Sequence, residues 1–329
     1  MAEIGRPVPG HHGPRVVALG GGHGLSTSLR ALRRVTDDVT AVVGVADDGG
    51  SSGRLRKEFG VVPPGDLRMA LAALCGDDAW GRTWSRVMQH RFSGDGELAG
   101  HATGNLLIST LWDETGSIVE GLDWVAALLG AHGRVLPVAT IPLNIVAQVQ
   151  GLDPAHPDVI TEVRGQAAVA HTPGNVIDIA IEPEEPQACA EAVDALRAAQ
   201  VVVLGPGSWY TSVMPHLLVP GVRIAVESSD AKRLLVLNLD AEPGETGGFK
   251  AHTYLNVLAQ RFPDLRLDWV LADERHVDDV DQLRQGCASV GAELVLDRMS
   301  AGAPGSESWS RHDPDLLAAA FSALLVSRS

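Results

Sequence analysis

A glycine-rich segment near the N-terminus carries residue types that bind anions. Gly20–Gly24 reads GGGHG and stands between a β-branched stretch, residues 15–19, and the helix-like sequence LSTSLRALRRV. Glycine allows backbone N–H groups to approach an anion closely, and the N-terminus of a following helix adds positive potential. Leu25 stands where a dinucleotide fingerprint has its third glycine, and no Lys-Ser/Thr pair follows as in a P-loop. The segment therefore predicts either a loop that binds an anionic group or a tight turn without a ligand.

A second segment, residues 47–57, combines acids, glycines, hydroxyls and cations after the next apolar stretch and reads DDGGSSGRLRK. Asp47 and Asp48 offer oxygen atoms that suit a ribose diol or a hydrated divalent metal. Arg54 can bind a phosphate with two parallel hydrogen bonds. The alternative is an Asp helix cap followed by a solvated charged face. So many donors and cations in an acidic protein favour an anionic ligand.

Two further segments hold polar residues at expected helix starts. Asp66 and Arg68 belong to PPGDLR, which on its own would be a rigid turn with a helix cap. His101 and Asn105 belong to HATGN, which precedes an apolar helix. A single histidine of this kind is more often structural than functional. Both segments become candidate site segments only because the chain also contains the glycine-rich segments.

Two glycine segments in the second half of the chain repeat the pattern of the first. Residues 205–208 read GPGS, follow an apolar strand and precede the hydroxyls of Thr211 and Ser212, which makes them a second candidate anion loop. Residues 242–249 read EPGETGGF and follow another apolar strand. Glycines and hydroxyls therefore follow at least four predicted strands, which is less probable by chance than any single occurrence.

The elements that would position these loops are parallel strands that alternate with helices. Apolar stretches predict strands at residues 15–19, 39–46, 201–205, 223–227, 233–239 and 267–273. Near-continuous apolar strands between amphipathic helices indicate a mainly parallel sheet covered on both faces, which is an α/β layered fold. The carboxyl ends of neighbouring parallel strands face one crevice, where open α/β folds bind ligands.

The middle of the chain departs from this alternation. Residues 133–150, 159–170 and 175–182 predict strands without helices between them. Tandem strands indicate an antiparallel insertion or edge. We therefore expect a single domain over residues 15–329 with a β insertion near 133–182. A flexible lead-in, rich in Gly, Pro and His, is expected at residues 1–14.

Composition limits the class of partner and the compartment. Lys and Arg total 26 against 41 Asp and Glu, a net charge of −15, and such a surface repels nucleic acid and anionic membranes. No stretch approaches the ~18 apolar residues of a membrane span, and the N-terminus lacks the apolar region of a secretory signal. Cys75, Cys189 and Cys287 lie far apart, which predicts neither a disulfide framework nor a cysteine metal site. These features predict a cytoplasmic protein with no nucleic-acid partner and no membrane insertion.

Taken in order, the segments resemble the gluconeogenesis factor (YvcK-like) family, part of the superfamily that includes 2-phospho-L-lactate transferase (CofD-like). The resemblance covers nearly the whole chain after residue 14, and its second and fifth motifs are the most specific. It is carried by GGGHGLS, ADDGGSSGRLR, PPGDLR, GHATGNLL, LGPGSWYTSVMPHLLVPG, EPGETGGF and HDP.

The resemblance implies a Rossmann-like three-layer α/β/α fold and a cytoplasmic regulator that binds a nucleotide sugar, UDP-N-acetylglucosamine. Such a regulator links gluconeogenic growth to cell-wall synthesis and cell shape, requires no cofactor, and has cell-wall or kinase regulatory proteins and a second copy of itself as candidate partners. The alternative is a metal-dependent transferase that acts on a nucleotide-activated substrate, in which Asp48, beside Asp47, would hold Mg²⁺. No catalytic residue is assigned, and His101 is the one candidate general base. A third possibility, a protein-interaction scaffold, predicts that mutations in the glycine loops leave function intact.

In the nucleotide-sugar hypothesis the diphosphate binds backbone N–H groups of Gly20–Gly24 and of residues 205–208, while Asp47 or Asp48 binds the ribose and Arg54 or Arg68 balances the phosphate charge. Relatives often carry Thr at the position of His23 and Tyr at that of Phe249, and the latter change removes a hydrogen bond but keeps ring stacking. The residues expected to contact the ligand are Gly20, Gly21, Gly22, His23, Gly24, Asp47, Asp48, Gly49, Gly50, Ser51, Ser52, Arg54, Asp66, Arg68, His101, Asn105, Gly205, Pro206, Gly207, Ser208, Thr211, Ser212, Thr246 and Phe249.

Overall fold

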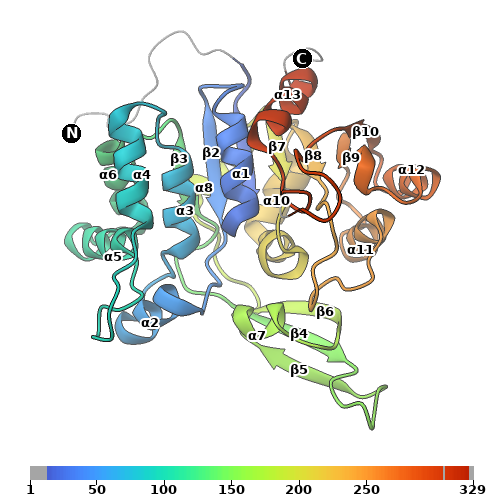
Figure 1. Ribbon diagram of the computed structural model, residues 1–329, viewed down its shortest axis with the longest axis horizontal. Helices are drawn as coiled ribbons and strands as arrows, with labels where there is room; N and C mark the ends of the chain where they lie inside the picture. The colour runs from blue at the N-terminus through green and yellow to red at the C-terminus, as the bar shows by residue number, and fades with distance from the viewer. Residues whose placement is uncertain (1–12, 307, 326–329) are drawn as a thin grey trace.

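The protein is built around one sheet of seven parallel strands, seen in a computed structural model that describes residues 13–306 and 308–325 (Figure 1). Most of the lead-in expected at residues 1–14 lies outside the described residues. The strand order is β10-β9-β8-β7-β1-β2-β3, and each adjacent pair is parallel. The strands are β1 (Val16–Gly20), β2 (Val39–Val43), β3 (Arg134–Pro137), β7 (Val201–Leu204), β8 (Lys232–Val236), β9 (Trp269–Asp273) and β10 (Glu293–Asp297).

Helices cover both faces of this sheet, which makes the fold a Rossmann-like three-layer α/β/α arrangement, as predicted. One packed group contains α1, α3 and α13, and another contains α8 and α10 (Figure 1). In the described part of the chain no helix is long and apolar enough to cross a membrane. The helices are α1 (Gly22–Leu32), α2 (Gly50–Phe59), α3 (Gly65–Ala73), α4 (Ala79–Gln89), α5 (Thr103–Thr115), α6 (Ile118–Leu129), α8 (Ala190–Ala198), α9 (Met214–Leu218), α10 (Pro220–Ser228), α11 (Ala251–Arg261), α12 (Val280–Ser289) and α13 (Pro314–Leu325), with a π-helical turn at Trp209–Val213 and a 3-10 turn at Glu274–His276.

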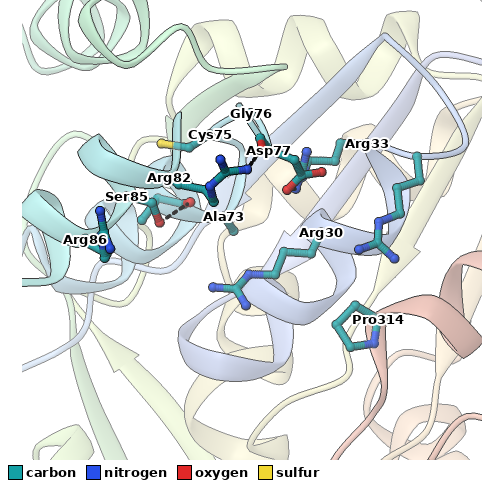
Figure 2. Close-up of a pocket in the computed structure, with 12 residues that line it drawn as sticks. Arg30, Arg33, Ala73, Cys75, Gly76, Asp77, Arg82, Ser85, Arg86 and Pro314 are labelled. Atoms are coloured by element: carbon teal, nitrogen blue, oxygen red, sulfur yellow. Dashed lines mark hydrogen bonds and ion pairs between the residues drawn. The ribbon is translucent and has the colours of Figure 1, made fainter. Parts of the chain in front are cut away.

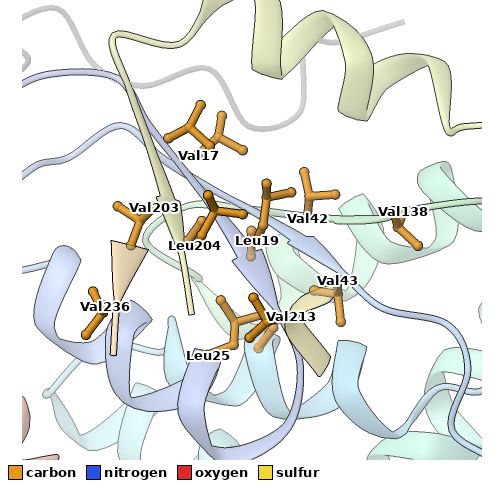
Figure 3. Close-up of a cluster of buried hydrophobic side chains, with 14 of the residues drawn as sticks. Val17, Leu19, Leu25, Val42, Val43, Val138, Val203, Leu204, Val213 and Val236 are labelled. Carbon is orange, nitrogen blue, oxygen red and sulfur yellow. The ribbon is translucent and has the colours of Figure 1, made fainter. Parts of the chain in front are cut away.

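The core lies where the central strands meet these helices. Leu19 of β1, Val42 of β2 and Val203 of β7 are at most 1% exposed and lie together in Figure 3. Each such side chain contributes roughly 1.5–3 kcal/mol relative to an exposed one. The central strands are apolar on both faces because helices cover both, so their termini are held rigidly.

A small antiparallel sheet forms the insertion and projects from the carboxyl edge of the main sheet (Figure 1). It contains β4 (Asn144–Gln150), β5 (Ile160–Arg164) and β6 (Asn175–Glu182) in the order β5-β4-β6, with the short helix α7 (Gln166–Ala170) after β5. The predicted insertion near 133–182 therefore starts too early, because β3 belongs to the main sheet. The expected strand at 159–170 divides into β5 and α7.

Two other strand predictions differ from the structure. Residues 223–227 were expected to form a strand but belong to α10. Pro220 stands in the first turn of this helix, and Val222, Ala225 and Val226 are buried at helical spacing while Ile224 is 55% exposed. The pattern of burial therefore prevails over the β-branched composition. Strand β10 was not predicted, because it lies at an edge of the sheet and is only partly buried.

The strand order reverses between β1 and β7. From β1 the chain proceeds through β2 to β3 on one side, and from β7 it proceeds through β8 and β9 to β10 on the other. Open α/β sheets bind ligands in the crevice at the carboxyl ends of strands where the order reverses. The topology therefore predicts a ligand site at the loops that follow β1 and β7.

Candidate functional site

The two glycine loops at the switch point touch each other. Gly20–Gly24 links β1 to α1, and residues 205–208 follow β7. A Cβ atom on Gly24 would collide with the carbonyl oxygen of Pro206 and would lie 2.8 Å from the Cα of Gly207. No side chain fits at position 24, so this glycine is what lets the two loops meet. The pairing of the two candidate anion loops is thus a feature of the fold.

The second loop is fixed, from the segment that follows β8, by the side-chain amide of Asn238, which sequence analysis did not single out. Asn238 accepts a hydrogen bond from the N–H of Gly207 at 2.9 Å and donates one to its carbonyl oxygen at 2.9 Å. Ser28 of α1 donates to the carbonyl oxygen of Gly205 at 3.3 Å. The one signal in the sequence is that Asn238 is a polar residue in the apolar run RLLVLNL. Loop 205–208 is therefore braced from both neighbouring elements.

One carboxylate, Asp66, borders the first glycine loop, and a second, Asp47, lies close to it at the start of α3. A Cβ atom on Gly21 would collide with Oδ2 of Asp66, and one on Gly65 would lie 2.7 Å from Oδ2 of Asp47. Burial raises the pKa of Asp66 to about 7, and the charge of Asp47 adds to this rise, while the N–H of Gly22 opposes it. A raised pKa beside a second acid is typical of paired acids in functional sites.

Asp48, in contrast, serves the inserted sheet. Its Oδ1 accepts a hydrogen bond from the N–H of Ala167 in α7 at 2.9 Å, and a Cβ atom on Gly165 would collide with its Oδ2. The neighbouring Asp47 instead accepts from the N–H of Gly49 at 2.9 Å. Of the two acids singled out in the sequence, Asp47 lies near Asp66 at the start of α3 and Asp48 holds the insertion.

A buried chain of polar side chains runs behind the site. Ser51, His101 and Asn105 are at most 6% exposed. Ser51 Oγ accepts from Asn105 Nδ2 at 3.0 Å and from the N–H of Ala102 at 3.3 Å, and it lies 3.0 Å from Nδ1 of His101. With both acceptor positions of Ser51 used, its proton goes to Nδ1, which assigns the Nε2–H tautomer to His101. Burial lowers the pKa of His101, so the ring is neutral.

This series of hydrogen-bonded side chains ends at a buried guanidinium group. Arg68 is 4% exposed and donates from Nε to Asn105 Oδ1 at 2.9 Å. Burial lowers its pKa to about 10, the charge of Arg91 lowers it further, and Asp66 and Asp47 act in the opposite direction. Arg68 remains charged at neutral pH and is the cation beside the two carboxylates.

The other predicted cations hold loops in place. Arg54 is exposed and donates to the carbonyl oxygens of Glu97 at 3.3 Å and of Ala99 at 2.7 Å. Its expected phosphate contact therefore competes with a role in ordering that loop. Arg56 donates to the carbonyl oxygen of Leu143 at 2.8 Å and to Asn144 Oδ1 at 2.7 Å, where the inserted sheet begins.

The fourth glycine segment, residues 242–249, supports the π-helical turn that follows the second loop. Glu245 is 2% exposed and accepts from the N–H of Tyr210 at 3.0 Å and from the hydroxyl of Thr211. Burial raises the pKa of Glu245 to about 7, although its hydrogen bond from Thr211 acts in the opposite direction. Thr246 is completely buried and accepts from Tyr254 at 3.2 Å. The hydroxyls of Thr211 and Thr246 are thus used inside the protein.

The predicted site residues fall into two groups. Around the meeting point of the loops lie Gly20, Gly21, Gly22, Gly24, Asp47, Asp66, Arg68, Gly205, Pro206, Gly207, Ser208 and Ser212. The supporting or peripheral positions are His23, which is exposed in α1, Asp48, Gly49, Gly50, Ser51 and Ser52 at the start of α2, Arg54, His101, Asn105, Thr211, Thr246 and Phe249. Phe249 packs edge-on against Tyr254 with ring centroids 5.3 Å apart.

The carboxylates of the site are too few to hold a metal ion by themselves. In residues 13–306 and 308–325 no three His, Cys, Asp or Glu side chains form a group that could hold a metal ion. Asp47 and Asp66 form a pair. Mg²⁺ is often bound by one or two carboxylates together with substrate phosphates. The residues fit Mg²⁺ only in company with a phosphorylated ligand.

Comparisons with known proteins agree over nearly the whole chain. The sequence profile of the family described as 2-phospho-L-lactate transferase CofD matches residues 16–303. A protein of Mycobacterium leprae is 50% identical over 316 residues, which are 95% of this chain and 86% of that relative. The gluconeogenesis factor of Bacillus subtilis is 34% identical over 266 residues, 81% of this chain and 80% of its own. The crystal structure of a UPF0052 family member from Bacillus halodurans superposes with a TM-score of 0.81 at 31% identity, covering 93% of this chain and 97% of that one.

Proposed function

The chain belongs to the gluconeogenesis factor family within the CofD superfamily, and we propose on this premise that it binds a nucleotide sugar such as UDP-N-acetylglucosamine. The observation that carries the proposal is the contact of the two glycine loops at Gly24. A diphosphate presents two anionic groups, and the first loop offers backbone N–H groups at the start of α1. The second loop offers the N–H of Ser208, because Pro206 has no N–H and those of Gly205 and Gly207 donate to Leu19 and Asn238. Together the two loops fit a diphosphate better than they fit a single phosphate.

The charges around the loops suit the rest of such a ligand. Arg68 balances phosphate charge from behind the loops. Asp47 is half-buried, and although its Oδ1 accepts from Gly49 and its Oδ2 lies against the start of α3, a carboxylate keeps further acceptor positions for the ribose diol. Asp66, with a pKa of about 7, can donate its proton to a phosphate oxygen when it is protonated.

In the cell, the proposed protein is a cytoplasmic regulator that couples gluconeogenic growth to cell-wall synthesis and cell shape. Family membership and the nucleotide-sugar chemistry support this role. Binding requires no cofactor in this proposal, and candidate partners are cell-wall or kinase regulatory proteins and a second copy of the chain. The net charge of −15 disfavours nucleic acid as a partner.

Isothermal titration with UDP-N-acetylglucosamine tests the proposal, with UDP and N-acetylglucosamine as partial ligands. We expect the whole nucleotide sugar to bind and Gly24→Ala to bind at least 10-fold more weakly, because the added methyl group separates the loops. Gly96→Ala is the matched control, since a Cβ atom there meets nothing within 4 Å. Absence of binding to the wild-type chain at millimolar ligand would refute the proposal.

A second function, a metal-dependent transferase acting on a nucleotide-activated substrate, is favoured by one observation, the pairing of Asp47 with Asp66 at the first loop. There the two carboxylates would hold Mg²⁺ together with the substrate phosphates, and the metal would neutralise charge on the phosphoryl oxygens. Asp66→Asn separates the two functions. Metal-free binding gains affinity when this negative charge is removed, whereas a Mg²⁺-dependent transferase loses both Mg²⁺ dependence and product formation.

A further inference from the structure

A cleft opens at the opposite edge of the main sheet from the glycine loops. It has a volume of about 370 Å³ and lies between the end of α1, the end of α3 and the helix α4, close to the start of α13. Helix α1 begins at the first glycine loop and ends at this cleft. At a rise of 1.5 Å per residue the cleft is therefore roughly 12–18 Å from that loop along the helix axis.

Five arginines line this cleft, which we name the arginine cleft: Arg30, Arg33, Arg34, Arg82 and Arg86. Figure 2 shows Arg30 extending from α1, with Arg82 and Arg86 on the wall formed by α4. In a chain with a net charge of −15, so many cations around one cavity are unexpected.

Helix electrostatics do not account for the whole cluster. Cations near the end of α1, such as Arg30, interact favourably with the helix dipole. Arg82, however, lies near the beginning of α4, where the dipole disfavours a cation, and it stands one turn from Arg86 on the same helix face. The placement of Arg82 beside Arg86 thus costs α4 stability, although Nη1 of Arg82 donates to the carbonyl oxygen of Asp77.

Protein carboxylates neutralise only part of this charge. Arg33 pairs with Asp77 at 2.6 Å and Arg34 pairs with Asp315, and both acids are more than 70% exposed. Within the described part of the chain neither Arg30 nor Arg86 makes an ion pair, which leaves their guanidinium groups free to bind a ligand.

Two features inside the cleft indicate a strong positive potential. The side chain of Arg33 is only 11% exposed, and its buried Nε has no hydrogen-bond partner among the described residues. A buried donor of this kind is costly unless something accepts from it. The hydrogen bond from Arg33 lowers the pKa of Asp77, and the charges of Arg34 and Arg82 contribute to this change.

We propose that the arginine cleft binds a small compound with two or more phosphate groups. Guanidinium groups bind phosphate oxygens in pairs through two parallel hydrogen bonds, and walls from two helices can engage two phosphates at once. The volume lies at the lower end of the range for small-molecule sites, which fits a compact polyphosphate rather than an extended peptide. The site is separate from the glycine loops and does not rest on the proposed function.

Titration calorimetry with inorganic pyrophosphate on the full chain tests this site. Sulfate serves as the comparison, because it has one anionic group where pyrophosphate has two. We expect pyrophosphate to bind, and Arg30→Gln combined with Arg86→Gln to weaken binding at least 10-fold. Both side chains are exposed and lack ion pairs in the described residues, so the fold should survive, as circular dichroism would verify. Arg197→Gln combined with Arg284→Gln removes the same charge from α8 and α12 and serves as the matched control.

Three outcomes would overturn the proposal. The first is no pyrophosphate binding to the wild-type chain at millimolar concentration. The second is equal loss in the two double variants, which would show a response to net charge alone. The third is tighter binding of a penta-glutamate peptide than of pyrophosphate, which would assign the cleft to an acidic protein segment. Because the glycine loops are themselves proposed to bind a diphosphate, the titration is repeated in Gly24→Ala, where the pyrophosphate binding that remains should still be lost on Arg30→Gln combined with Arg86→Gln, which keeps the two sites distinguishable.

Discussion

Ser51 joins groups from two helices behind the candidate site. Its hydroxyl accepts from Asn105 and from the N–H of Ala102 and faces Nδ1 of His101, so one oxygen atom links α2 to the start of α5. Through Asn105 the link reaches Arg68, the buried cation beside the two carboxylates. The position of that charge therefore depends on a hydroxyl that contacts no ligand in the proposed arrangement.

Replacing Ser51 by alanine should reveal this dependence. Ser51→Ala leaves Asn105 Nδ2 and the N–H of Ala102 without their acceptor, so we expect the free energy of unfolding to fall by about 1–3 kcal/mol. The hydrogen bond that favours neutral His101 is also lost, so the pKa of His101 should rise. Urea unfolding and an NMR titration of the imidazole measure the two effects.

A matched control is available in the same region. Ser109 of α5 has a buried hydroxyl without a hydrogen-bond partner in the described residues, so Ser109→Ala should not lower the free energy of unfolding and should leave the pKa of His101 unchanged. An unchanged pKa of His101 in Ser51→Ala would contradict the assigned hydrogen bond and with it the tautomer.

At the scale of elements, the inserted sheet is fastened by two side chains, one in the last turn of α2 and one just before that helix. Arg56 donates to the beginning of β4, and Asp48 accepts from the N–H of Ala167 at the start of α7. These contacts place the insertion beside the carboxyl edge of the main sheet, where the glycine loops lie (Figure 1). The insertion is thus positioned by the same segment that carries Asp47.

Releasing these contacts should loosen the insertion alone. In Asp48→Ala combined with Arg56→Met, we expect amide hydrogen exchange in β4–β6 to accelerate at least 10-fold, since hydrogen bonds to charged groups contribute about 1.5–3 kcal/mol each. Exchange in β1 and β7 should stay the same. Arg164→Met removes exposed ion pairs within the small sheet and should have little effect. Equal acceleration in the main sheet would show that the insertion is not a separate unit.

The sequence could predict those elements whose environment is uniform. Strands β1, β2, β7 and β9 are buried on both faces, so their apolar runs identify them directly. Residues 223–227 carry a similar β-branched run, but whether Ile224 faces solvent depends on what covers it, and no local pattern contains that information. The half-exposed edge strand β10 was missed for the related reason that its apolar signal is weak.

The candidate site was predictable to the same degree. The succession of strand, glycine and helix in the sequence identifies the glycine loops, and the parallel sheet brings them to one edge. The division of labour between Asp47 and Asp48 was not predictable, because it depends on Ala167, which is far away in the sequence. Asn238 was missed for the same reason, since its role is defined only by the loop it meets.

For the whole molecule, buried histidines and buried acids give its stability opposite dependences on pH. Burial lowers the pKa of His312 to about 4, like that of His216. Burial raises the pKa of Glu245 to about 7, like that of Asp66. His216 and Asp66 illustrate the two directions. His216 is completely buried, and burial lowers its pKa to about 4, so stability falls as pH decreases from roughly 6.5, its unfolded value, to that pKa. Burial raises the pKa of Asp66 to about 7, so stability falls as pH increases from roughly 4, its unfolded value, to that pKa. Between pH 4.5 and 6.5 the two contributions to the slope oppose each other.

Removing each group singly should tilt the stability profile in opposite directions. His216→Leu removes the loss of stability at low pH, so its free energy of unfolding should fall more steeply with rising pH than that of the wild-type protein. Asp66→Asn should rise relative to wild type over the same interval. One proton corresponds to about 1.4 kcal/mol per pH unit, and the contribution of Asp66 is smaller because water partly screens it. Urea unfolding at half-unit steps from pH 4.5 to 6.5 measures the slopes. Parallel curves for the two variants would mean that neither group is protonated differently in the folded and unfolded chains, and the assignment of Asp66 as a proton carrier beside the glycine loop would then be wrong.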